Sequence, residues 1–155
     1  MGTQSNAQRE VQLLAEWITT LPPWFKTKTH VRVGEQRLYY ADPTIPASRA
    51  RALEVWSDWT DCRIFTGAEV WIVEAKLVGV ASAYGQVMDY IDEYPLSTDY
   101  ANFTPTPIIP MVLCAAEKPR TRILFQRYGV RTVVFTPSWA SRAISTKIVG
   151  DLTGL

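Results

Sequence analysis

The chain has 155 residues, of which 47% are hydrophobic and 20% are charged. A chain of this length and apolar content can bury one sizeable core, so we expect a single domain over residues 1–155 and exclude an intrinsically disordered protein. The 16 basic and 15 acidic residues give a formal net charge of +1. That charge supplies no long-range attraction toward nucleic acid, membranes or acidic partners.

The ends and cysteines of the chain bear on its compartment. The first residues are polar and lack the apolar core of a signal peptide, and no apolar run is long enough to span a bilayer. Cys62 and Cys114 form no C-x-x-C pair, which favours reduced core thiols over a disulfide. We therefore expect a cytoplasmic protein that is neither secreted nor membrane-spanning.

Hydrophobic spacing predicts helices and strands along the whole chain. Apolar residues recur at helical spacing over 8–21, and Pro22-Pro23 ends this helix. In chain order, the next predicted elements are a hairpin or two short strands over 27–33 and 37–41, a short helix over 47–56, strands over 61–66 and 69–76, a helix over 79–94, a strand over 108–115, a helix over 120–128, a strand over 130–135 and a last helix over about 137–149. Strands that alternate with helices predict an α/β (α+β) fold with a central mixed β-sheet flanked by helices.

The strands on either side of Gly67-Ala68 have the signature of a hairpin with a two-residue loop. In that register Thr66 pairs with Glu69, and Asp61 lies directly opposite Glu74, with Cβ atoms about 4.5 to 5.5 Å apart. A three-residue loop is the alternative, and it would turn Asp61 to the other face of the sheet.

Glu74 and Lys76 are two residues apart on one strand, so their side chains share a face. With Asp61 opposite, two carboxylates converge beside an ammonium, and such carboxylates repel unless a cation compensates them. An all-oxygen pair suits Mg²⁺ or Mn²⁺, which predicts a metal-dependent phosphodiesterase with Asp61 and Glu74 as metal ligands and Lys76 assisting attack. Taken alone, Glu74 and Lys76 are better explained as the salt-bridged, solvated face of an edge strand.

The helix that follows carries Gln86 and Tyr90, four residues apart and therefore on one helical face. The order Asp61, then Glu74-Ala75-Lys76, then this pair resembles the PD-(D/E)xK nuclease superfamily, and specifically its RecB-like branch with a Q-x-x-x-Y motif. The resemblance covers about residues 58–135. It implies a restriction-endonuclease-like core, Mg²⁺- or Mn²⁺-dependent hydrolysis of DNA, and a supporting role at the site for Gln86 and Tyr90.

Two positions of the motif have alternatives in this sequence. The first acid is Asp61 or Asp58, and only the pairing argument favours Asp61. Members of the superfamily often carry an acid on the first helix, for which Glu16 or Glu10 is the candidate.

The charges are unevenly distributed along the chain. Residues 64–117 contain seven acids and one base, whereas residues 118–147 contain no acid and seven bases, namely Lys118, Arg120, Arg122, Arg127, Arg131, Arg142 and Lys147. This basic third is either a phosphate-contacting face or a set of separate solvated side chains. Trp24, Trp59 and Trp139 are candidates for stacking on bases or filling a subunit interface.

A chain of this length has little room for a target-recognition domain. Specificity would then come from a partner, a homo-oligomer, a larger assembly or the structure of the DNA. The alternative function is a catalytically silent module of the same fold that binds nucleic acid or serves in assembly, for example within a phage particle or packaging apparatus.

Overall fold

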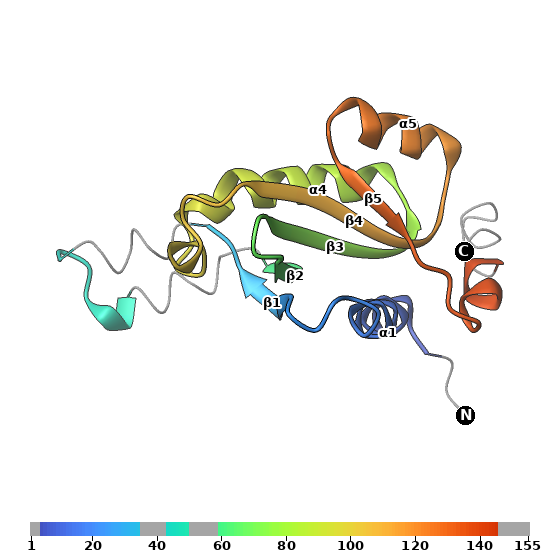
Figure 1. Ribbon diagram of the computed structural model, residues 1–155, viewed down its shortest axis with the longest axis horizontal. Helices are drawn as coiled ribbons and strands as arrows, with labels where there is room; N and C mark the ends of the chain where they lie inside the picture. Colours follow the sequence, from blue (N-terminus) through green and yellow to red (C-terminus); the bar gives the residue numbers. More distant parts are fainter. Residues whose placement is uncertain (1–3, 35–42, 50–58, 146–155) are drawn as a thin grey trace.

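The computed structural model describes residues 4–34, 43–49 and 59–145 (Figure 1). In chain order its elements are helix α1 (Asn6–Ile18), strands β1 (Lys26–Arg32), β2 (Trp59–Phe65) and β3 (Val70–Gly79), helix α4 (Ala81–Glu93), the 3₁₀ helices η1 (Tyr94–Leu96) and η2 (Tyr100–Asn102), strand β4 (Ile108–Glu117), helix α5 (Pro119–Arg127) and strand β5 (Arg131–Val134). The predicted mixed sheet flanked by helices is confirmed.

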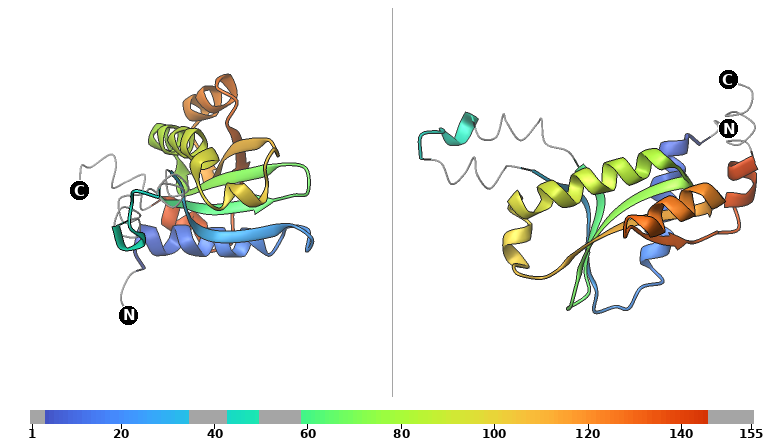
Figure 2. Two further views of the ribbon diagram at one scale, coloured as in Figure 1. Left: turned by 90° about the vertical axis from the view of Figure 1, so that its left-hand side faces the viewer. Right: turned by 90° about the horizontal axis from the view of Figure 1, so that it is seen from above.

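The five strands form one sheet in the order β1-β2-β3-β4-β5. The pairs β1–β2 and β2–β3 are antiparallel, whereas β3–β4 and β4–β5 are parallel. Parallel neighbours need a crossover connection, and α4 and α5 lie in the two that this sheet requires. Figure 2 shows α1 on one face of the sheet and α4 and α5 on the other.

Each face of the sheet buries its own apolar cluster. On one face, Leu13, Leu14 and Trp17 of α1 pack against residues of β2, β3 and β4 that include Val73 and Ala75. The other cluster joins Val87 and Tyr90 of α4 and Phe125 of α5 to Ile72 of β3 and Val112 of β4. Side chains alternate along a strand, so Glu74 and Lys76 belong to the face that α4 covers.

The described α-helices and strands lie where the sequence predicts them, with shifted ends, whereas η1 and η2 were not predicted. Helix α1 begins earlier than predicted because Ser5 and Gln8 form a capping box at its start. The strand predicted over 37–41, most of the helix over 47–56, and Asp58 lie outside the described residues. The last predicted helix is described only as far as residue 145. Within that part, Ala140 and Ala143 pack into the apolar cluster under α1.

A buried ion pair fastens the connection between α4 and β4 to the sheet. Arg63 of β2 donates to both carboxylate oxygens of Asp99, from Nε at 2.8 Å and from Nη2 at 3.1 Å. The Tyr94 hydroxyl donates to the same carboxylate at 2.7 Å. Burial opposes ionisation of Asp99, but its bonds to Arg63 and Tyr94 outweigh burial and lower its pKa.

We expect Asp99→Asn to lower the free energy of unfolding by about 3 kcal/mol, because it leaves the buried Arg63 guanidinium without its counter-charge. Urea denaturation at neutral pH measures this loss. Glu69→Gln is the matched control, since its carboxylate pairs with Arg131 at the surface and an exposed pair contributes under about 1 kcal/mol. Equal losses in the two variants would contradict a special role for the buried pair.

Candidate functional site

The register of the β2–β3 hairpin decides where its charged side chains meet. The ladder pairs Cys62 with Val73, the register expected from a two-residue loop. Gly67 has a φ of 95°, the left-handed conformation that glycine adopts readily at such a turn. Continued by one residue, this register places Asp61 opposite Glu74.

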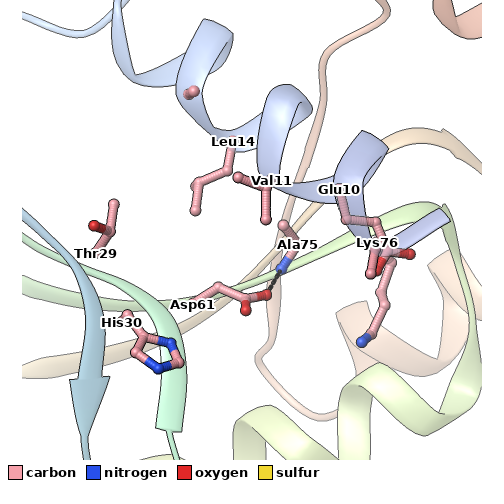
Figure 3. A pocket seen from close by; sticks show the side chains of 10 residues that line it. Glu10, Val11, Leu14, Thr29, His30, Asp61, Ala75 and Lys76 are labelled. Carbon is pink, nitrogen blue, oxygen red and sulfur yellow. Dashed lines mark hydrogen bonds between the residues drawn. The ribbon is translucent and has the colours of Figure 1, made fainter. Parts of the chain in front are cut away.

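The two strands stop pairing through their backbones beyond Cys62, and side chains of β2 take over. Oδ2 of Asp61 accepts a hydrogen bond of 2.8 Å from the Ala75 N–H (Figure 3). One residue earlier, the Thr60 hydroxyl donates to the Val73 carbonyl at 2.9 Å. The Asp61 carboxylate is therefore held against β3, next to the position of Glu74.

Glu74 is a buried carboxylate with an incomplete set of partners. Glu74 is only 3% exposed. Its Oε1 lies 2.8 Å from Nζ of Lys76. Its buried Oε2 has no hydrogen-bond partner in the described part of the chain. Burial, and next the negative charge of Asp61, raise the pKa of Glu74 to about 7, although Lys76 opposes the shift.

Lys76 is the cation of this group. Burial lowers its pKa, but the hydrogen bond and charge of Glu74, together with the charges of Glu10 and Asp61, outweigh burial and raise it. The ammonium is therefore protonated at neutral pH. We refer to Asp61, Glu74 and Lys76 as the carboxylate–lysine cluster.

The first helix contributes one acid to the same place. Oε1 of Glu10 accepts from the Leu77 N–H at 3.1 Å. Glu16 is turned elsewhere, since its Oε1 accepts from Gln12 at 2.8 Å and from the Trp139 indole at 3.0 Å. Of the two acids that the sequence offers on this helix, Glu10 is the one beside the cluster.

A hollow of about 550 Å³ lies between α1 and strands β1, β2 and β3 (Figure 3). We call it the acidic hollow. Its apolar wall belongs to α1 and its polar wall to the sheet and Glu10, and the residues are Ala7, Glu10, Val11, Leu14, Ala15, Thr29, His30, Asp61, Ala75 and Lys76. Asp61 and Lys76 of the cluster line the hollow, whereas the buried Glu74 does not.

His30 is a residue of this hollow that sequence reasoning did not associate with the site. The β1–β2 ladder pairs Thr29 with Cys62 and Val31 with Thr60, which leaves His30 facing Asp61 between two regular pairs. Its φ of 55° is rare for a residue with a side chain. The pairing of β1 with β2 is the only signal that would have found it, and residues 33–58 between the strands leave that register undetermined in the sequence.

Gln86 and Tyr90 lie on α4, over the face that carries Glu74 and Lys76. Tyr90 is 8% exposed and packs in the cluster under α4. Gln86 is half-buried, and within the described residues it makes no hydrogen bond or ion pair to the carboxylates. The structure thus brings together Asp61, Glu74 and Lys76. Residues Gln86 and Tyr90 lie on the helix above them, and Gln86 makes no direct polar bond to the carboxylates.

The basic third of the chain is partly neutralised by ion pairs. Arg122 pairs with Glu117, and Arg131 pairs with Glu69 at 3.0 Å. Lys147 lies outside the described residues.

Two of the tryptophans that the sequence singles out have different surroundings. Trp24 is 72% exposed, whereas the Trp59 ring stacks on His30 with centroids 4.1 Å apart.

The chain matches no protein-family profile, no curated protein and no solved structure. Among the described residues, no three His, Cys, Asp or Glu side chains gather closely enough to hold a metal ion by themselves. No helix in the described ranges is long and apolar enough to cross a membrane.

The raised pKa of Glu74 predicts a pH-dependent loss of stability. The folded protein holds this proton more tightly than the unfolded chain, so the free energy of unfolding falls as pH rises from the ordinary value of 4.5 to about 7. We expect Glu74→Gln to remove up to about 2 kcal/mol of this decline. Urea denaturation in a chelator between these pH values measures it.

Glu69→Gln is the control for that measurement, because the hydrogen bond from Arg131 chiefly lowers the pKa of this exposed carboxyl. Its pH dependence should change in the opposite direction to that of Glu74→Gln. An unchanged decline in Glu74→Gln would show that the pH dependence has another source.

Proposed function

We propose that the chain is a metal-dependent nuclease with a restriction-endonuclease-like core, which hydrolyses DNA phosphodiester bonds at the carboxylate–lysine cluster. The observation that carries the proposal is the state of Glu74. A buried carboxylate repelled by a second one is unfavourable in a purely structural role, and its Oε2 has no partner among the described residues.

The donor set fits a hard divalent cation. Oxygen ligands from one or two carboxylates are what Mg²⁺ uses in enzymes, with waters and substrate phosphate completing its shell. Asp61 and Glu74 are the residues that would hold it, and the cation would relieve their repulsion.

Mg²⁺ or Mn²⁺, when bound, supplies positive charge to a phosphodiester and lowers the pKa of a coordinated water. The chain supplies the remaining functions. The Lys76 ammonium stabilises the negative charge that develops on the phosphate in the transition state. The Ala75 N–H orients Asp61, and Glu10 fixes β3 just beyond Lys76 through the Leu77 N–H.

The order of elements also supports the proposal. The carboxylate–lysine cluster lies on a hairpin that is followed by a helix, a parallel strand, a second helix and a further parallel strand. This is the succession that the resemblance to PD-(D/E)xK nucleases implies.

The alternative is a catalytically silent module of this fold that binds nucleic acid or takes part in assembly, within a phage particle for instance. The direct Glu74–Lys76 ion pair favours it, because the 2.8 Å contact can persist as a structural element without a metal. The next two experiments separate the alternatives.

We expect the wild-type chain to cleave DNA with Mg²⁺ or Mn²⁺, and Asp61→Asn, Glu74→Gln and Lys76→Ala each to lower the rate by at least about a hundredfold. Gel analysis of end-labelled single-stranded and duplex DNA measures cleavage. Glu69→Gln, a surface carboxylate of the same hairpin, should retain the wild-type rate. A wild-type chain as inactive as the Glu74 variant would contradict the nuclease.

Metal binding is tested without catalysis. Mg²⁺ or Mn²⁺ at about 100 times its dissociation constant should stabilise the wild-type fold by about 2.7 kcal/mol. Thermal unfolding should show this shift more strongly at pH 8 than at pH 6, because the cation competes with the proton on Glu74. Asp61→Asn should lose the shift and Glu69→Gln should keep it. A wild-type midpoint that does not respond to either metal would contradict the metal site.

A further inference from the structure

The carboxylate–lysine cluster opens into the acidic hollow through two of its side chains. Asp61 and Lys76 line the hollow, next to Glu10 of α1. In the proposed reaction a phosphodiester lies at this cluster, and it carries one nucleoside on each side of its phosphorus. The hollow is therefore a space into which one of these nucleosides can extend.

The interior of the hollow is unfavourable for a second phosphate. Glu10 and Asp61 accept hydrogen bonds from backbone N–H groups of β3, at 3.1 and 2.8 Å, which hold both carboxylates in place. The ammonium of Lys76 is already paired with Glu74 at 2.8 Å. Because the two acids repel a further phosphate, the part of a nucleotide that suits this space is its uncharged part, the sugar and the base.

One wall of the hollow is apolar. It belongs to α1 and consists of Ala7, Val11, Leu14 and Ala15. Val11 is 69% exposed, so the wall offers apolar surface that a ligand can cover. Thr29 and His30 of β1 lie across the hollow from it (Figure 3). A body with apolar faces and a polar edge, such as a nucleobase, matches these two walls.

The size of the hollow bears on the form of DNA that it can admit. Its volume of about 550 Å³ is within the range of about 300 to 1,000 Å³ that sites for small molecules occupy. A base inside a duplex is paired and stacked, so it enters such a site only after it has left the double helix. The cost of leaving is lowest for a base that is already unpaired.

We propose that the acidic hollow receives an unpaired nucleoside next to the phosphodiester at the carboxylate–lysine cluster, which makes the chain selective for DNA with an unpaired base at the cleavage position. The placement of the phosphodiester rests on the proposed nuclease function. The α1 wall contacts a face of the base, and Thr29 and His30 are the polar side chains that its edge meets.

The test uses fluorescently labelled DNA duplexes of one sequence in three forms: fully paired, with a single bulged nucleotide, and with an abasic unit in place of the bulged nucleotide. The abasic form keeps the extra phosphate and the flexible backbone but offers no base. Anisotropy titrations in Ca²⁺ measure affinity, because Ca²⁺ also takes carboxylate and phosphate oxygens. Gels of the same samples verify that the DNA is intact.

We expect the bulged duplex to bind roughly tenfold more tightly than the paired and abasic forms, as the contact of one base with a protein surface contributes. Ala15→Leu narrows the hollow from an exposed position of α1 and should reduce this preference to about twofold or less. Gln126→Leu is the matched control, because it places the same side chain at an exposed position of α5, on the opposite face of the sheet (Figure 2). Thermal unfolding verifies that both variants are folded.

Equal affinities for the bulged and abasic duplexes would overturn the proposal, because they would show recognition of a flexible backbone and not of a base. Wild-type protein that binds none of the duplexes, or equal effects of Ala15→Leu and Gln126→Leu, would also overturn it. A preference for the bulged duplex without Mg²⁺-dependent cleavage would uphold the hollow and contradict the nuclease. Cleavage of all three duplexes at one rate would uphold the nuclease and contradict the hollow.

Discussion

The candidate site depends on the place where β2 and β3 cease to pair through their backbones. A regular ladder would occupy the Ala75 N–H with a carbonyl of the opposite strand. Here that N–H donates to Asp61 Oδ2 instead, so a carboxylate is held in the plane of the sheet by a rigid donor. This bond fixes Asp61 beside Glu74 and at the edge of the acidic hollow.

The site concentrates unfavourable electrostatics in an otherwise well-satisfied fold. Arg63 and Asp99 are an example of a buried ion pair with a structural role. The side-chain nitrogens of Arg63 and oxygens of Asp99 each have a hydrogen-bond partner. Glu74 is treated differently, with one oxygen bonded to Lys76 and the other unpartnered in the described residues. Proteins tolerate such local instability where a ligand later relieves it, and in this respect Glu74 differs from the fully bonded Asp99.

The sequence predicts the parts of this molecule that local rules control. The loop at Gly67 sets the hairpin register, so the meeting of Asp61 and Glu74 follows from counting residues. Contacts between distant segments are not predictable in this way. Glu10 reaches Leu77 across 67 positions, and Asp99 reaches Arg63 across 36, and no turn or periodicity specifies either pairing.

Which basic side chains are paired with acids is also determined by the fold and not by their order in the sequence. By sequence, the bases of residues 118–147 are either a phosphate-contacting face or separate solvated side chains, and the fold shows that Arg122 and Arg131 are paired with acids. The bases of β1 are fewer and lie in a segment that the distribution along the chain does not single out. The sheet places Lys28 and Arg32 in a hollow that shares His30 with the acidic hollow.

The position of β1 at the border of the described sheet has a consequence for solubility. An edge strand presents backbone groups to which a strand of another molecule can add, and lysines along the edge discourage such addition through repulsion and hydration. The alternation of Lys26, Lys28 and Arg32 with small or β-branched residues is therefore also a barrier against edge-to-edge aggregation. Neutral substitutions at Lys26 and Lys28 would lower this barrier, and the protein would then associate at lower concentrations.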